Sequence, residues 1–457
     1  MRRLITAAGG AVAVAGCVAG LLYLGPATGS PTATAPAATA PAGGAPGGSA
    51  PVGGAPVGDA LAAGALDTAR KRTETYPRDP VGWAALARAE IEQARTTLDA
   101  ARLEAADRAL RRSLALDTTG NYAADVGRGQ LANARHQFAQ GREHGLRATR
   151  MAPDRPDGYA VLADAEIQLG HYPAARAAAQ RLLDLAPASA SYSRAAYDLE
   201  TNGRPADAAI ALNRAVDSAS TTGERAFAQT RLGDLAWSRG EPDRAAKHYR
   251  YALDTEPEYP YAVAGAARVL AARGEPDKAL DTYERLTART PLPQFLLEAV
   301  ELRASMPDVS SASRASRAGS GESGSGGEAA ALAAQVRLLR ADGGPVDPQL
   351  ALFAADHGDP AVAVELMRGE WKRTRSVITA DALAWALHRD GRDGEALEYA
   401  RRAAATGWEN ALFRYHRGAI EQALGLPGAR RHLRAALETN PHFSPYHAAR
   451  ARELTRK

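Results

Sequence analysis

Small and large apolar residues recur along most of this chain at the spacing of one helical face, and the pattern stops at regular intervals. The clearest stretch runs from Leu232 to Pro257, with a break at Gly240 and Pro242. A glycine can end a helix in the left-handed conformation, and a proline is tolerated in the first turn of the next helix. We therefore predict two helices joined by a tight turn in this stretch.

The same pattern returns about every 34 residues, which is a period typical of stacked helical repeats. Turns of similar sequence stand at Gly274, Gly358 and Gly391. One helix pair cannot bury its apolar face alone, so neighbouring pairs must stack on each other. The pattern predicts an all-α superhelical solenoid, because no sustained alternation of β-branched and polar residues indicates strands. Copies of the pattern end at Pro153, Pro187, Pro257 and Pro291.

The spacing of these residues resembles the tetratricopeptide repeat (TPR) family. In that family a large–small pair lies in helix A and a glycine lies at the turn; small, large and small residues follow in helix B before a terminal proline. The resemblance implies a superhelical solenoid of about nine or ten helix-turn-helix repeats that binds proteins or peptides in a concave groove. The matching residues of one unit are Leu232, Gly233, Gly240, Ala245, Tyr249, Ala252 and Pro257.

Two low-complexity stretches mark the borders of the repeats. Residues 25–58 are almost entirely Pro, Ala, Gly, Thr and Ser, and they predict a disordered linker. Residues 305–328 are dominated by Ser, Gly, Ala and Arg, and they predict an insertion that loops out of one repeat or acts as a hinge. We therefore divide the repeats into an N-terminal array, residues 59–304, and a C-terminal array, residues 329–457.

Residues 1–24 predict a signal or an anchor. Two arginines precede Leu4–Leu24, which carries no charge and is long enough as a helix to cross a bilayer. Arginines on this flank favour a cytoplasmic N-terminus and an extracytoplasmic array. Three interpretations stay open: a retained transmembrane anchor, a cleaved secretion signal, and lipidation at Cys17, because the residues before it resemble a lipobox. We expect the array to be anchored at the cell surface, or else secreted or lipid-anchored at Cys17.

Charge and cysteine content narrow the classes of partner and chemistry. The 56 basic and 52 acidic residues leave a net charge of +4 and are interleaved along the chain. Such mixing is typical of a solvated surface and not of a nucleic-acid interface. Cys17 is the only cysteine, so the chain can form no internal disulfide. We expect no nucleic-acid partner.

The motifs that carry chemistry are only fragments. His388–Asp390 matches three letters of a kinase catalytic loop, but no glycine-rich phosphate loop precedes it. His416, His432, His442 and His447 are the densest histidines, and a metal site there would need further ligands that converge in space. We expect no enzyme activity, no cofactor and no metal. The alternative is an enzyme or a metal-binding protein with its site in the C-terminal repeats.

The concave groove implied by the resemblance is the candidate binding site. Its acidic residues Asp164 and Asp234 favour a ligand with positive charge, and the lysines that clamp a peptide carboxylate in some TPR proteins are missing from these positions. Phe227, Trp237 and Tyr261 either form an aromatic anchor pocket or pack between helices. The complete set of predicted groove residues is Asp164, Tyr197, Phe227, Thr230, Asp234, Trp237, Tyr261, Arg268, Asp381 and Trp385.

These patterns predict a class of function. We expect a non-catalytic protein–protein interaction scaffold, tethered to the membrane and facing outward, that binds peptide segments or a partner protein in its groove. An adaptor that is anchored in the membrane and faces the cytoplasm is the alternative, and it differs only in the orientation of residues 1–24.

Overall fold

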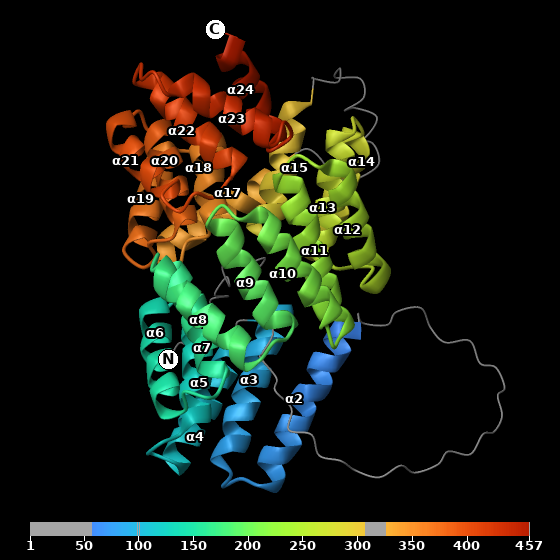
Figure 1. The fold of residues 1–457 in the computed structure, drawn as a ribbon, viewed down its shortest axis with the longest axis vertical. Helices are drawn as coiled ribbons and strands as arrows, with labels where there is room; N and C mark the ends of the chain where they lie inside the picture. Colours follow the sequence, from blue (N-terminus) through green and yellow to red (C-terminus); the bar gives the residue numbers. More distant parts are fainter. Residues whose placement is uncertain (1–56, 98, 100, 307–325, 457) are drawn as a thin grey trace, which may run out of the picture.

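The described part of the chain consists of stacked helix pairs. The computed structural model describes residues 57–97, 99, 101–306 and 326–456, and every regular element in these ranges is an α-helix. Ten helix pairs follow one another there, with α2 before the first pair and α24 after the last (Figure 1). The predicted all-α solenoid is therefore confirmed, and the number of pairs agrees with the prediction.

The pairs use consecutive helices, the first of each pair being helix A and the second helix B. The seventh pair is formed by α15 and α17, which flank the predicted insertion. The helices are α2 (Val57–Thr75), α3 (Pro80–Thr97), α4 (Ala101–Leu116), α5 (Tyr122–Ala134), α6 (Phe138–Met151), α7 (Asp157–Gln168), α8 (Tyr172–Leu185), α9 (Ser189–Thr201), α10 (Pro205–Asp217), α11 (Thr222–Ser238), α12 (Pro242–Thr255), α13 (Pro260–Ala272), α14 (Pro276–Arg289), α15 (Pro293–Ser305), α17 (Gly327–Asp342), α18 (Pro348–His357), α19 (Pro360–Trp371), α20 (Val377–Arg389), α21 (Asp393–Ala403), α22 (Ala411–Ala423), α23 (Ala429–Thr439) and α24 (Pro445–Arg456).

Several predicted segments lie outside the described residues. They are residues 1–24 with Cys17, the linker up to residue 56, and most of the predicted insertion, residues 307–325. None of the helices in the described ranges is both long and apolar enough to span a bilayer.

Most turns between helix A and helix B contain one residue in the left-handed region. The backbone angle φ is 76° at Gly170 and 70° at Gly240, and His136 holds the same place in the second pair with a φ of 56°. The predicted turn of this type at Gly358 is wrong, because its φ is −137°. There Asp359 caps α19 instead, and its side chain accepts a hydrogen bond from the N–H of Ala361 at 2.9 Å.

Small residues allow neighbouring helices to approach a large side chain, as the repeat pattern predicts. Tyr249 on α12 is fully buried, and its ring lies against Gly233 on α11 and Gly265 on α13. A Cβ atom added at Gly233 would lie 2.5 Å from the ring. These glycines are therefore fixed by packing and not by backbone conformation.

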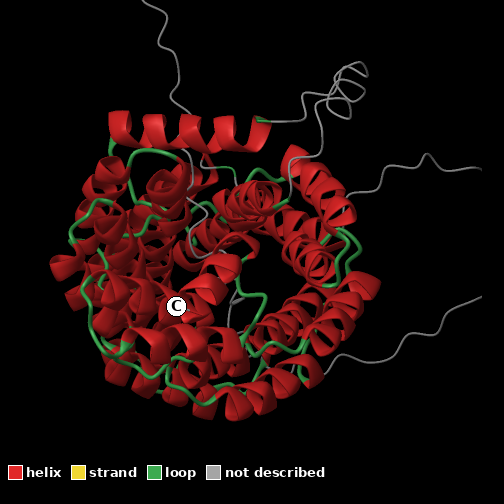
Figure 2. Ribbon diagram, turned by 90° about the horizontal axis from the view of Figure 1, so that it is seen from above, coloured by secondary structure: helices red, strands yellow, loops and turns green. Residues whose placement is uncertain are grey.

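The superhelix winds so tightly that its last pairs rest on its earlier ones. Figure 1 shows α18 to α24 directly above α5 to α10, and Figure 2 shows the helices arranged around a common axis. The Arg375 N–H, before α20, donates a hydrogen bond of 2.9 Å to the Gln168 carbonyl at the end of α7. The Val377 N–H donates to the Tyr172 hydroxyl at 2.8 Å across 205 residues. One superhelical turn thus takes about six repeats.

This contact between superhelical turns, which we call the seam, continues along two further repeats. The Asn440 side-chain amide donates to the Trp237 carbonyl at 2.8 Å across 203 residues. Between these points, Gly203 lies so close to Gly407 that an added Cβ would stand 2.7 Å from the Gly407 carbonyl oxygen. At the seam the turn glycine is therefore needed for two reasons: its left-handed φ of 70° and the backbone that passes above it.

Two glycine substitutions separate these two reasons. Gly274→Ala changes a left-handed turn residue whose added Cβ would have no described atom within 4 Å beyond its chain neighbours. We expect it to lower the free energy of unfolding by about 1 kcal/mol. Gly203→Ala adds the clash with Gly407, so we expect a loss of about 2–4 kcal/mol and a larger radius of gyration in small-angle X-ray scattering. Equal losses and unchanged radii in both variants would show that the seam contributes nothing.

Candidate functional site

The A helices α7, α9, α11 and α13 carry a row of charged side chains that pair from one repeat to the next. Arg194 on α9 donates hydrogen bonds from Nε and Nη2 to the two carboxylate oxygens of Asp164 on α7, both at 2.9 Å. Arg231 on α11 donates to Glu200 on α9 at 2.9 Å. Each pair joins neighbouring A helices, so this row, which we call the inner row, helps to fix the stacking of the repeats.

Asp234 lies at the centre of the inner row. Its Oδ1 accepts hydrogen bonds from the Tyr249 hydroxyl at 2.9 Å and from Arg268 Nη2 at 3.2 Å. Its Oδ2 accepts from Arg231 Nη1, also at 3.2 Å. Arg268 extends the row to α15, where its Nε lies 3.6 Å from Glu298 Oε2. One carboxylate thus links α11, α12 and α13.

The inner row lies deep in the molecule but is not sealed from water. The side chains of Arg231, Asp234 and Arg268 are 18%, 23% and 19% exposed. Burial opposes the charge on Arg268, but Tyr249 and the carboxylates beside it hold its pKa well above the usual value. Burial raises the pKa of Glu200 in spite of the nearby Arg231. Each charge in the row has a neighbour of opposite charge, so the row has no large excess of either sign.

Half of the predicted groove residues are buried packing residues. Thr230 donates its hydroxyl hydrogen to the Ala226 carbonyl of its own helix, and Trp385 belongs to the largest apolar core. The prediction that these side chains line an open groove is corrected, because they are buried in packing contacts, such as Tyr197 against Trp408 and Trp385 against His416 and His447. The buried ones, each no more than 7% exposed, are Tyr197, Phe227, Thr230, Asp381 and Trp385.

The acidic groove residues are engaged by arginines of the protein itself. Asp164 is held by Arg194, and Asp234 is held by Arg231 and Arg268. Their expected attraction for a positively charged ligand is therefore reduced, because the neighbouring guanidinium groups already balance both carboxylates.

The three aromatic groove residues do not form one pocket. Phe227 is 5% exposed, whereas Trp237 and Tyr261 are partly exposed. The Arg268 guanidinium lies 6.0 Å from the Trp237 ring centre, and Tyr261 packs edge-on against Phe295 at 5.4 Å. Asp234, Arg268 and Trp237 are thus the predicted residues that the structure places together with some exposure to solvent, and Tyr261 lies on the same helix as Arg268.

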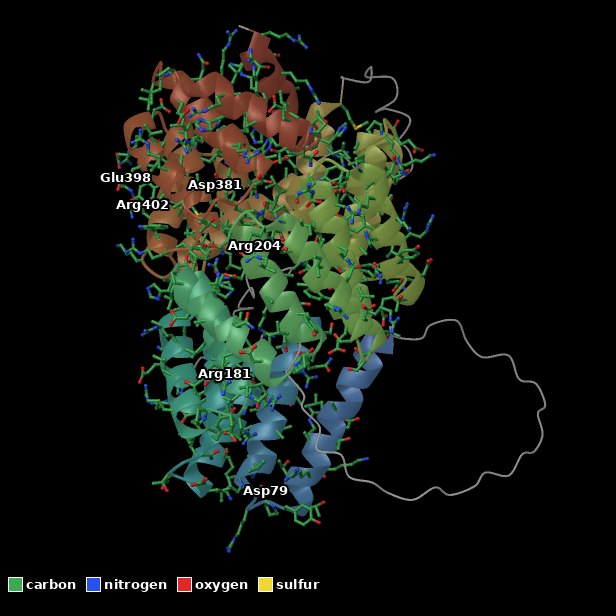
Figure 3. All side chains as sticks on the ribbon, in the orientation of Figure 1. Asp79, Arg181, Arg204, Asp381, Glu398 and Arg402 are labelled. Atoms are coloured by element: carbon green, nitrogen blue, oxygen red, sulfur yellow. The ribbon has the colours of Figure 1, made fainter. Side chains whose placement is uncertain are left out.

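The predicted C-terminal groove residues belong to a buried cluster of histidines and carboxylates. His416 stacks on Trp385 with ring centres 4.1 Å apart, and its Nδ1 lies 2.8 Å from Asp381. The Trp385 Nε1–H donates to Asp356 at 2.9 Å, and His447 Nε2 lies 3.1 Å from the same carboxylate. These contacts fasten α22 to α20, and α24 to α18. Figure 3 labels Asp381 among the C-terminal helices, where it is buried.

Burial and pairing act against each other on the carboxylate of this cluster. Burial opposes the charge on Asp356, yet hydrogen bonds from His447 and Trp385 hold its pKa below the usual value. Two histidines with one carboxylate each are not a metal site, and no group of three possible ligands converges in the described ranges of the chain. The cluster therefore acts as a packing element of the last repeats.

Sequence reasoning missed the partners that complete the inner row. Arg194, Arg231 and Glu298 are not among the predicted groove residues, although each pairs with a carboxylate or an arginine about one repeat away. A search for opposite charges about 30 residues apart on consecutive A helices would have found them. Their pairing converts a predicted acidic groove into a balanced one.

Comparison with known families identifies the repeats. Residues 161–222 and residues 236–299 each match a family model described as tetratricopeptide repeat. No curated protein matches the chain.

Several solved structures are similar to the chain. A thermophilic TPR protein of Thermus thermophilus is 18% identical, with a TM-score of 0.36, and the match covers 40% of this chain and 99% of that one. YrrB, a TPR protein with an unusual peptide-binding site, is 18% identical, with a TM-score of 0.29 over 44% and 97% of the two chains. The human IFIT1 dimer with m7Gppp-AAAA is 14% identical, with a TM-score of 0.45 over 75% and 76%. These similarities are low, so the assignment rests on the repeat matches and on the helix pairing.

The stacked pairs and the inner row define an α-solenoid. The two repeat matches extend from α7 into α15, and left-handed turn residues like those of the matched repeats recur in other pairs, at His136, Gly391 and Gly425. The chain is a tetratricopeptide repeat protein, as the sequence predicts. Arrays of these repeats serve as protein-interaction scaffolds, because their stacked helices present an extended surface.

The energetic role of the inner row can be measured at its central carboxylate. Asp234→Ala leaves Tyr249 and two arginines without this partner, and we expect the free energy of unfolding to fall by about 2–3 kcal/mol. The control is Glu398→Ala, which removes an ion pair of 2.6 Å with Arg402 at the outer edge shown in Figure 3. A loss of about 0.5 kcal/mol is expected there. Urea unfolding compares the two variants, and similar losses would refute a structural role for the inner row.

Proposed function

We propose that this protein is a non-catalytic scaffold that binds segments of other proteins along the A helices of its first superhelical turn. The observation that carries the proposal is the partly exposed part of the inner row, Asp234 on α11 and Arg268 on α13. The partly exposed rings of Trp237 and Tyr261 lie on the same two consecutive A helices. Paired charges beside aromatic rings can exchange hydrogen bonds with a peptide backbone and bury its side chains.

The inner row is suited to a ligand that carries no net charge. Arginine and carboxylate groups alternate from Asp164 to Glu298, so a peptide meets donors and acceptors in turn. The peptide amide groups can satisfy both. We propose that the ligand is an extended protein segment that lies across several repeats.

We further propose that residues 1–24 hold the repeats at the membrane with the array on the extracytoplasmic side. The charge-free stretch Leu4–Leu24 and the arginines before it support this orientation. Secretion, lipid anchoring at Cys17 and a cytoplasm-facing array are the competing arrangements. Residues 25–56 then separate the anchor from α2.

Site-specific photocrosslinking in intact cells tests the binding surface. The full chain carries p-benzoylphenylalanine in place of Tyr261 on α13 or in place of Tyr251, which is 39% exposed on α12. We expect protein crosslinks from position 261 and few from position 251, because position 261 lies on the A helix that carries Arg268 of the inner row, whereas position 251 lies on a B helix. Crosslinks of equal yield from both positions, or none from position 261, would contradict the proposed surface.

Protease treatment of the same intact cells tests the orientation. We expect the repeats to be cut from outside and the N-terminal segment to stay with the membrane. Repeats that stay intact until the cells are opened would identify the cytoplasm-facing arrangement, and repeats found in the medium would identify secretion.

A further inference from the structure

An apolar groove lies on the outer surface between α10 and α12. It has a volume of about 320 Å³, and α11 forms its floor. Ile210 on α10 stands at its edge with 63% of its surface exposed, while Leu232 and Leu235 beneath it are buried. Its apolar lining includes Pro205, Ala209, Ile210, Leu232, Leu235 and Ala236, and Arg239, Glu241, Arg244 and His248 also line it.

Ile210 is unusual for its place in the repeat. It is the sixth residue of α10, whose first residue, Pro205, lies two positions after the turn glycine Gly203. In four of the five other B helices that follow a left-handed turn glycine, the residue at this place is small or charged and exposed, and in the fifth, α23, it is the partly buried His432. An exposed large aliphatic residue beside an apolar groove indicates a contact surface more than a solvated one. The four corresponding residues are Ala177, Lys247, Asp281 and Glu398.

The groove continues into a second depression at the seam. This depression has a volume of about 180 Å³ and shares Pro205, Leu235 and Arg239 with the groove. Its far wall comes from the second superhelical turn and includes Trp408, which packs edge-on against Tyr197 at 6.2 Å. The combined site therefore exists only where the two superhelical turns meet.

The seam end of the site has an excess of negative charge. Glu438 is exposed and forms no ion pair with any residue that the structure describes, and Glu409 lies 3.8 Å from Arg414 with half of its side chain exposed. Arg239, the basic residue of this lining, is 3.3 Å from Glu241 in the groove. A ligand that carries a cation here would gain attraction from carboxylates that are largely exposed to solvent.

We propose that this site, formed by the α10–α12 groove and the seam depression, binds a segment of a partner protein with an aliphatic side chain and a basic side chain. The aliphatic side chain packs on Ile210 and Leu235 in the groove. The arginine or lysine lies between Glu409 and Glu438, beside the Trp408 ring. The site meets the inner row only at Glu200, which lines the seam depression. Ile210 and Glu438, which the test below changes, lie outside that row, so the scaffold function proposed above can fail without this inference failing.

Selection of peptides from a phage-displayed library of random dodecapeptides tests the inference. The full chain is the target, and the selected peptides are synthesised and titrated against three variants. Ile210→Lys introduces the residue type that α12 has at this place, Glu438→Lys reverses the unpaired charge, and Ala177→Lys is the matched control on α8. Circular dichroism and thermal unfolding confirm that each variant keeps the fold.

We expect selected peptides to combine aliphatic residues with arginine or lysine. Affinity should fall about ten-fold or more in Ile210→Lys and in Glu438→Lys, remain unchanged in Ala177→Lys, and decrease with added salt. Selection of no peptide, of acidic peptides, or of peptides that bind Ile210→Lys as tightly as wild type would overturn the inference. A wild-type dimer that becomes monomeric in Ile210→Lys would also overturn it, because a second copy would then occupy the groove.

Discussion

The contact of one superhelical turn with the next is the constraint on which the rest of this structure depends. The tight turns at Gly170, Gly203 and Gly240, each between helix A and helix B of one pair, contact backbone about 200 residues later in the chain. Gly203 and Gly407 approach too closely for a side chain to fit between them. Because these contacts join backbone directly to backbone, they fix the distance between successive superhelical turns and hence the curvature of the array. A solenoid that contacted only its neighbours along the chain would be free to open and extend.

The tight curvature determines what the inner face can contain. Neighbouring A helices lie so close that residues such as Phe227 and Thr230 are buried between them, and the remaining inner positions face their counterparts one repeat away. Charges in such a place must be paired, since isolated ions in a poorly solvated interior are costly. Asp234 and its partners satisfy this requirement, and they leave an inner face that is polar, balanced and only partly open.

The helices, the turns and the class of fold could be predicted from the sequence because they depend on local signals. Gly240 followed by Pro242 ends one helix and starts the next regardless of what packs around them. The failure at Gly358 has a local cause as well, because the Asp359 side chain supplies a cap and the glycine keeps a negative φ. The repeat spacing then predicts a similar pair of helices in each repeat along most of the chain.

The site was harder to predict because it depends on curvature that accumulates over six repeats. Nothing near Trp408 in the sequence indicates that it packs beside Tyr197, and nothing near Thr230 indicates whether an A helix faces a wide groove or a narrow one. The pairing of Asp164 with Arg194 follows from stacking geometry, since their separation of 30 residues matches the repeat only approximately. Residues with a purely local role were therefore predicted well, and residues with a role between repeats were not.

Hydrogen exchange at the loop before α20 tests the seam most directly. The N–H groups of Arg375 and Val377 lie in or beside a loop, and their hydrogen-bond acceptors, the Gln168 carbonyl and the Tyr172 hydroxyl, come from the preceding superhelical turn. The closed superhelix predicts slow exchange at both positions in the wild type, and faster exchange at Val377 in Tyr172→Phe, which lacks the hydroxyl acceptor. Exchange at both positions as fast as in an exposed loop would contradict the closed superhelix.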